Sequence, residues 1–214
     1  MRQLFIIKSR SAYVDCVPKH LIDDVINRFK DAYAIYVYGG SLDCSGGDVD
    51  IAVFMEGIPR EIPRIGDNVD LQVFRKPRNT LFFVYVIKTG RLIYGSPLDI
   101  DVNSAIWNEL ELIDEREFLF LNSDDEVVVC KSLKELLFLL AAIKCGIQGS
   151  SNWYRMVKCL NGLGIDVPIE FKHCLNPPSI DVLRSIGEPV LKRVIQELKS
   201  IKQGYAAGFH SNPF

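Results

Sequence analysis

The sequence contains no long hydrophobic run. Its longest apolar stretch, residues 136–143, falls far short of the roughly 20 residues that a transmembrane helix requires. Residues 1–8 have too short an apolar core for a secretory signal peptide, and no small-residue cleavage site follows them. We therefore expect no membrane partner and predict a cytoplasmic protein.

The sequence also lacks a Cys-x-x-Cys pair, although it has six cysteines. The chain has three histidines, and the only neighbours that resemble metal ligands are Cys16 with His20 and His173 with Cys174. Their spacings match no known zinc-ligand pattern, so we expect no zinc site. In a reducing compartment the cysteines are most simply buried thiols that act as small hydrophobic side chains.

The net charge is only −2, but it conceals an asymmetry along the chain. Residues 1–130 contain 14 Lys and Arg against 21 Asp and Glu, whereas residues 131–214 contain 11 against 6. The second part is therefore basic. A basic surface can hold a phosphate-bearing acceptor, but lysines that solvate helix faces give the same count, and the sequence leaves both explanations open.

Hydrophobic periodicity indicates a mixed first part. Apolar residues at helical spacing predict a helix over residues 18–31. Strands are expected over residues 33–38, around residues 48–54 and over residues 69–74. Residues 80–88 are apolar on several faces, and periodicity alone allows either a helix or a strand there.

The second part has a helical pattern, with helices predicted over residues 132–145, 152–161 and 180–202. Ser132 is the expected N-cap of the first of these helices, because Glu135 three residues later completes a capping box. The predicted fold class is α/β (α+β): a small mixed sheet flanked by helices, followed by an all-helical domain. We place the two domains at residues 1–122 and 131–214.

Three aspartates are spaced so that they can meet. Asp48 and Asp50 are two residues apart at the start of a hydrophobic strand, and residues i and i+2 of a strand point to one face. Asp70 lies in the next strand-like segment and joins them if the two strands pair. Like charges about 4 Å apart repel by roughly 4 kcal/mol at an effective dielectric near 20, so such a cluster calls for a cation. Carboxylate oxygens favour magnesium.

A glycine-rich turn precedes these aspartates, because Gly39-Gly40-Ser41 ends the strand predicted at residues 33–38. Backbone N–H groups in such a turn can bind phosphate, especially if Ser41 opens a helix whose positive end faces the same way. The turn and the carboxylates together predict a metal-dependent site for a nucleoside triphosphate.

An Asp-x-Asp pair by itself carries little information. The chain has 16 aspartates, so chance alone produces roughly one such pair. A second pair, Asp99 and Asp101, also follows a glycine and a serine. Only two residues separate Ser96 from Asp99, and one of them is Pro97, so no helical turn can form between them. We expect Asp99 and Asp101 to be ordinary loop residues.

The first set has its parts in a definite order: an apolar strand, Gly-Gly-Ser, a spacer, Asp-x-Asp on a strand, and a third Asp on another strand. This order resembles the signature of the DNA polymerase β-like nucleotidyltransferase superfamily. The resemblance covers residues 17–98, and residues 86–95 look like the end of a small, minimal nucleotidyltransferase domain, which implies a helix over residues 80–88. The matching residues are Tyr38, Gly39, Gly40, Ser41, Asp48, Asp50 and Asp70.

The resemblance implies transfer of a nucleoside monophosphate from a nucleoside triphosphate to an acceptor hydroxyl, with release of pyrophosphate. Asp48 and Asp50 would hold one or two Mg²⁺ ions, and Asp70 would bind the second ion or take the acceptor proton. Gly40 and Ser41 would contact the β and γ phosphates. The helical half would choose the acceptor, which the sequence leaves open between RNA, a protein and a small molecule.

Three alternatives remain open. Asp48 and Asp50 could instead end a turn and make Asx-type hydrogen bonds. The six-residue spacer between Ser41 and Asp48 is short for the family, and Leu42-Asp43-Cys44 stands where a basic residue often follows. Both departures support a binding protein with a degenerate site, such as an antitoxin-like protein or a scaffold. The basic turn at residues 75–78 could reach the triphosphate or be a solvated surface turn.

Overall fold

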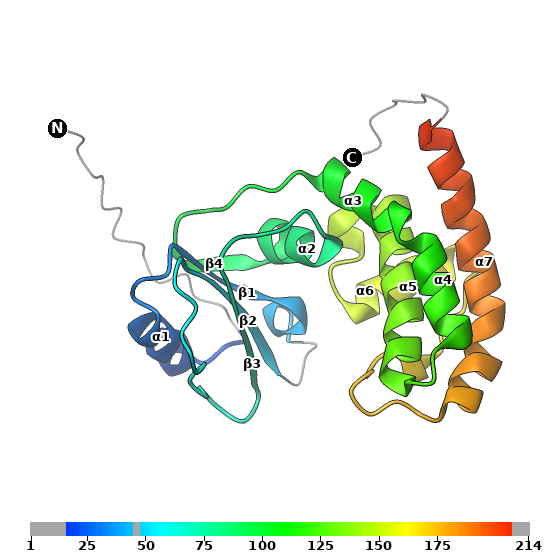
Figure 1. The fold of residues 1–214 in the computed structure, drawn as a ribbon. Coiled ribbons are helices and arrows are strands. Elements are labelled where there is room, and N and C mark those ends of the chain that lie inside the picture. Colours follow the sequence, from blue (N-terminus) through cyan, green and yellow to red (C-terminus); the bar gives the residue numbers. More distant parts are fainter. Residues whose placement is uncertain (1–15, 45–47, 207–214) are drawn as a thin grey trace. The chain divides into compact units, whose positions relative to one another are not determined.

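The structure, a computed structural model, describes residues 16–44 and 48–206, without the side chains of residues 205 and 206. The opening segment that bears on the signal-peptide prediction and residues 45–47 of the predicted spacer lie outside the described residues. Figure 1 shows the chain, which divides into two compact units. The division falls between Ile100 and Asp101, and residues 79–81 group with the second unit.

The first unit is built on a four-stranded mixed sheet. Its elements are α1 (Lys19–Arg28), β1 (Ala34–Tyr38), the 3-10 turn η1 (Gly39–Leu42), β2 (Val49–Phe54), β3 (Val69–Phe74), α2 (Leu81–Thr89) and β4 (Arg91–Gly95). The strand order is β3-β2-β1-β4; β1 runs antiparallel to both β2 and β4, whereas β2 and β3 are parallel. Residues 55–68 supply the dozen or more residues that a connection between parallel neighbours requires.

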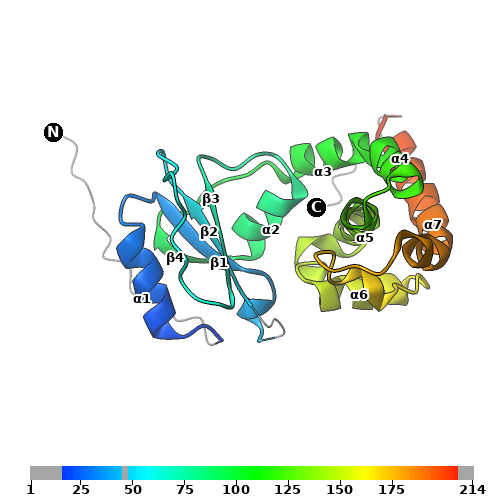
Figure 2. The same ribbon diagram turned by 60° about the horizontal axis from the view of Figure 1, so that its bottom comes forward.

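Different helices cover the two faces of this sheet, α1 on one side and α2 on the other (Figures 1 and 2). Successive strand residues point to opposite faces, and the odd-numbered residues of β1 and β2 are all aliphatic. They form a hydrophobic core with Ile22 and Val25 of α1. The opposite face carries aromatic side chains, and Phe83 of α2 packs there against Phe54 and Phe74.

The second unit is helical. Its elements are α3 (Val102–Glu111), α4 (Ile113–Asn122), α5 (Glu126–Gly149), α6 (Trp153–Gly162), the 3-10 turn η2 (Ile169–Phe171) and α7 (Ile180–Ala206). Helix α5 is central and contacts α3, α4, α6 and α7 (Figure 2). Most side chains between Val129 and Ala142 are buried, as is typical of a helix in the middle of a domain. Over the described ranges, no helix has the length and apolar character to cross a bilayer.

The predicted fold class is confirmed, and α2 is a helix as the family resemblance implied. The division between the units differs from the boundary placed at residues 122–131. Helix α4 packs against α5 and α7, and α3 also contacts α5, so both helices group with the second unit. Residues 123–125 therefore connect two helices of one unit. Their polar composition suggested a linker between domains, but the packing of α4 against α5 and α7 places them inside the second unit.

Helix α5 begins earlier than predicted. Asp125 is its N-cap, and the Asp125 carboxylate accepts hydrogen bonds from two amides of the first turn at 2.8 and 3.1 Å. Ser132 lies inside the helix, where its hydroxyl donates to the carbonyl of Val128 at 2.7 Å, so the predicted capping box is wrong. β-Branched valines favour strands by propensity, but the burial of Val129 in the helical core overrides that preference.

The prediction of reduced thiols is also wrong. The six cysteines form three disulfide bonds: Cys16–Cys44, Cys130–Cys174 and Cys145–Cys159. Their Cα atoms lie 5.3, 5.5 and 6.3 Å apart, within the range that a disulfide requires. The partners are 28, 44 and 14 residues apart in the sequence, so only the folded chain brings them together.

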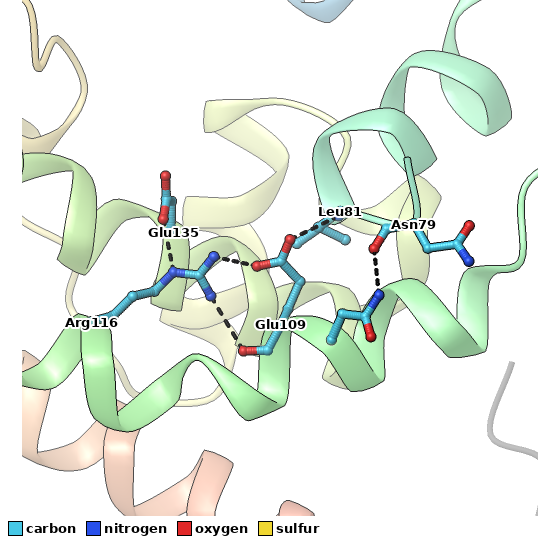
Figure 3. Close-up of polar contacts among 6 residues, drawn as sticks. Asn79, Leu81, Glu109, Arg116 and Glu135 are labelled. Carbon is cyan, nitrogen blue, oxygen red and sulfur yellow. Dashed lines mark hydrogen bonds and ion pairs between the residues drawn. The ribbon is translucent and has the colours of Figure 1, made fainter. Parts of the chain in front are cut away.

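A buried ion pair joins three helices of the second unit (Figure 3). Arg116 of α4 pairs with Glu109 of α3, and each side chain is only 10% exposed. Arg116 also pairs with Glu135 of α5 at 2.8 Å. The other carboxylate oxygen of Glu109 accepts a hydrogen bond from the backbone N–H of Leu81 at 3.0 Å. Each buried charge therefore has a partner, which is the condition under which such a pair is tolerated.

The disulfide assignment predicts the reactivity of the purified protein. When the protein is denatured without a reductant and treated with an alkylating reagent, mass spectrometry should find no modified cysteine. After reduction, all six cysteines should be modified. Alkylation of either member of a pair in the unreduced protein would contradict that disulfide bond.

The buried ion pair predicts that two variants of the second unit lose very different amounts of stability. Arg116→Met leaves the Glu109 charge buried without its cation and should lower the free energy of unfolding by about 3–5 kcal/mol. Lys144→Met removes a more exposed pair, with Glu197 at 2.9 Å, and should cost no more than about 1 kcal/mol. Urea denaturation followed by circular dichroism measures both values, and equal losses would contradict the role of Arg116.

Candidate active site

Asp50 and Asp70 face each other across the parallel pair of β2 and β3. Asp50 is the register partner of Asp70 on one side and of Tyr38 in β1 on the other. Neighbouring strands lie about 4.8 Å apart, and directly paired residues point to the same face of the sheet. Tyr38, Asp50 and Asp70 therefore form one row across three strands, which we call the carboxylate row. The predicted site depended on the pairing of the two strands that carry these aspartates, and the pairing of β2 with β3 is confirmed.

The charges of the three predicted carboxylates all affect the pKa of the Tyr38 phenol. Burial is the main cause that raises the pKa of Tyr38 far above its usual range. The negative charges of Asp50, Asp70 and Asp48 raise this pKa further, in that order. Tyr38 therefore keeps its proton and stays neutral beside the carboxylates.

Asp48 lies immediately before β2, and its side chain is exposed. Its charge has the weakest effect of the three on Tyr38. Across residues 16–44 and 48–206, no three His, Cys, Asp or Glu side chains stand close enough together to hold a metal ion. The structure thus pairs Asp50 with Asp70 and leaves Asp48 at the margin of the carboxylate row.

The glycine turn lies directly against Asp50. Gly39 has a φ of +71°, and a Cβ at Gly39 would overlap Oδ2 of Asp50 and lie 3.3 Å from its carboxylate carbon. Only glycine combines this backbone conformation with such a close approach. The turn η1 is a single 3-10 turn of four residues rather than the start of a longer helix. The Ser41 hydroxyl is buried and donates to the carbonyl of Tyr38 at 2.8 Å, so it stabilises the turn.

Gln72 lies beside Asp70, although it was not among the residues predicted for the site. It follows Asp70 by two residues on β3, so both side chains lie on the same face. The side-chain amide of Gln72 donates a hydrogen bond to Oδ2 of Asp70 at 3.0 Å. The strand alternation that selected Asp48 and Asp50 would also have identified Gln72.

The basic turn at residues 75–78 lies at the other end of β3. Asp70 is the second residue of this strand, whereas the turn follows its last residue, Phe74. Arg75 follows Asp70 by five positions, which corresponds to roughly 16 Å of extended chain. The Tyr33 hydroxyl donates to the carbonyl of Arg75 and holds the turn there. The structure therefore favours the solvated surface turn of the two explanations.

Asp99 and Asp101 are loop residues, as predicted. The Asp101 carboxylate accepts a hydrogen bond from the backbone N–H of Ser104 at 3.0 Å and caps α3. Lys88 donates to Asp99 at 3.2 Å, and this hydrogen bond is the main cause that lowers the pKa of the Asp99 carboxyl. Local hydrogen bonds thus account for the second Asp-x-Asp pair.

The donor atoms of the carboxylate row suit a hard divalent cation. Asp50 and Asp70 supply carboxylate oxygens, which are the ligands that magnesium prefers. Magnesium in phosphate-transfer sites commonly takes one or two carboxylates and completes its shell with water and substrate phosphates. Like charges directly opposite each other on neighbouring strands destabilise a sheet, and a bound cation would offset that repulsion.

No family model, curated protein or solved structure matches this chain. The interpretation of the site therefore depends on its own residues and geometry.

The close approach of Gly39 to Asp50 predicts that a methyl group added at Gly39 destabilises the protein. Gly39→Ala forces a side chain into a left-handed backbone conformation and against a carboxylate, and it should lower the free energy of unfolding by about 1–3 kcal/mol. Gly57→Ala is the matched control, because a Cβ at Gly57 meets nothing within 4 Å. The control should change the stability by no more than about 0.5 kcal/mol. Urea denaturation decides between these expectations, and equal effects would contradict the geometry of the turn.

Proposed function

We propose that this chain is a magnesium-dependent nucleotidyltransferase, which moves a nucleoside monophosphate from a nucleoside triphosphate to an acceptor hydroxyl and releases pyrophosphate. The observation that carries this proposal is the pairing of Asp50 with Asp70 across β2 and β3, beside a glycine turn that touches Asp50. The ordered set of residues that resembles the DNA polymerase β-like superfamily supports the same reaction.

Asp50 and Asp70 would hold the magnesium ions, and Asp48 would complete the ligand set. Magnesium held by these carboxylates would supply the positive charge that stabilises the phosphates during transfer. Asp70 would bind the second ion or take the proton of the acceptor hydroxyl. Gln72, which donates to Asp70, would keep that carboxylate in one orientation.

The glycine turn would contact the triphosphate. Gly39 and Gly40 carry no side chain, so a phosphate can approach the backbone of the turn closely. The Ser41 hydroxyl donates to the carbonyl of Tyr38 and would act by holding the turn in place. Phosphate contacts from Gly40 and Ser41 would therefore come from their backbone N–H groups.

The acceptor is an RNA, a protein or a small molecule. The excess of Lys and Arg over Asp and Glu in residues 131–214 favours an acceptor that carries phosphate. Incubation of the protein with nucleotides labelled at the α phosphate and with a cell extract would identify the molecule that gains the label.

A second candidate function is a nucleotidyltransferase-like binding protein without turnover. Two observations favour it: η1 is a single short turn, and within the described part of the chain no three ligating side chains are assembled around a metal position. Isothermal titration with ATP, in the presence and in the absence of magnesium, separates the two functions. Nucleotide binding that depends on magnesium is expected of the enzyme, whereas binding that does not depend on magnesium would favour the binding protein.

A cytoplasmic location stays a prediction. Disulfide bonds are rare in the cytosol of most cells, but intracellular proteins of hyperthermophiles are rich in them. A cytoplasmic nucleotidyltransferase with three disulfide bonds would fit the second setting.

The proposed roles of the carboxylates predict a specific loss of activity. Asp50→Asn and Asp70→Asn should each reduce label transfer by more than roughly a hundredfold, because even indirect support of a metal ligand is worth ten- to a hundredfold. Asp99→Asn alters the second Asp-x-Asp pair and should leave transfer unchanged. Removal of magnesium with a chelator should abolish transfer, and restoring magnesium should recover it.

Circular dichroism must show that the Asn variants remain folded. Substantial transfer by folded Asp50→Asn protein would contradict the proposed reaction, and so would transfer that persists in the chelator.

A further inference from the structure

Aromatic rings gather beside the carboxylate row on the face of the sheet that α2 covers. Phe74 and Phe83 lie 4.9 Å apart between ring centroids, and Phe54 lies within 6 Å of both. Phe82 bridges from these rings to the carboxylate row, with its centroid 5.8 Å from that of Phe74 and 5.6 Å from that of Tyr38. We call Tyr38, Phe54, Phe74, Phe82 and Phe83 the aromatic cluster.

Phe82 is the exposed member of this cluster. Phe82 is 37% exposed, whereas Phe54, Phe83 and Tyr38 are buried and Phe74 is partly buried. A single exposed phenylalanine is ordinary on a protein surface. Phe82 differs because its ring touches Tyr38 edge to face, and Tyr38 is the register partner of Asp50. The Tyr38 side chain therefore lies between the exposed surface of Phe82 and the proposed metal ligand Asp50.

We propose that the exposed surface of Phe82 stacks against the base of the nucleoside triphosphate that binds at the carboxylate row. This inference rests on the proposed function, and it names a residue that would bind the nucleoside part of the substrate. Stacking between a base and an aromatic ring tolerates any base, because every base has a π face. The site would thus gain affinity for nucleotides over inorganic phosphates without selecting one base.

The surrounding residues favour a fixed platform. Tyr38 and Phe74 contact Phe82 from two directions, and Phe82 and Phe83 lie 5.1 Å apart, so the ring has little freedom to turn away. The base of a bound nucleotide is tethered to the phosphates, so its approach to Phe82 costs less entropy than that of a separate molecule. This tether favours the donor nucleotide over a base of a nucleic acid acceptor.

The experiment compares three ligands and three variants by isothermal titration in magnesium. The ligands are ATP, inorganic tripolyphosphate and a single-stranded oligonucleotide without a triphosphate. Phe82→Leu removes the aromatic surface but keeps an apolar side chain, whereas Phe82→Trp keeps an aromatic surface. Phe118→Leu is the control, because Phe118 is 63% exposed on α4 and is not part of the aromatic cluster.

Phe82→Leu should weaken ATP binding by roughly ten- to a hundredfold, the range expected for loss of one stacked base. Its affinity for tripolyphosphate should not change. Phe82→Trp should bind ATP at least as tightly as the original protein, and Phe118→Leu should bind every ligand unchanged. ATP binding that is unaffected in Phe82→Leu would overturn the proposal, and so would equal losses for ATP and tripolyphosphate.

The oligonucleotide and the transfer assay separate this proposal from the proposed function. Loss of oligonucleotide binding in Phe82→Leu, with ATP binding intact, would overturn the assignment to the donor nucleotide. ATP binding that depends on Phe82, in a protein that transfers no nucleotide, would support the platform and overturn the transfer reaction. A protein that binds neither ATP nor the oligonucleotide would overturn both.

Discussion

The parallel register of β2 and β3 is the constraint on which the candidate site depends. It sets Asp50 opposite Asp70, and the antiparallel register of β1 and β2 places Tyr38 on the other side of Asp50. A slip of one residue would turn the acidic side chains toward the α1 face, into the aliphatic core that Ile51 and Val53 now occupy. The hydrophobic core on one face of the sheet thereby determines where the carboxylates lie on the other.

The site is locally unfavourable for folding, since like charges sit on neighbouring strands and a glycine backbone presses against one of them. Such local conflicts are expected where a sequence serves function rather than stability. The surrounding structure compensates in specific ways. Ser41 donates to the carbonyl of Tyr38, Gln72 donates to Asp70, and the Cys16–Cys44 disulfide joins the segment before α1 to the residues that follow the turn.

The second unit depends on the burial of its central helix. This helix, α5, has few polar side chains between Val129 and Ala142, so other helices must cover it. Two disulfides and a buried ion pair add to that packing. Arg116 satisfies Glu109 and Glu135 together, so one guanidinium links three helices.

The sequence alone determined α1, the strands β1 to β3, the central part of α5, α6, α7 and the face that the acidic residues share, because strand alternation and helical periodicity are local properties of the chain. It placed Asp50 and Asp70 on strands that pair in the structure, and it correctly predicted that Asp99 and Asp101 are loop residues. Tertiary structure alone decided which cysteines meet, where α5 begins and that α4 belongs to the helical unit. It also placed Phe82 beside Tyr38. These features depend on contacts between distant residues, and no local pattern records the packing that makes one such contact more stable than another.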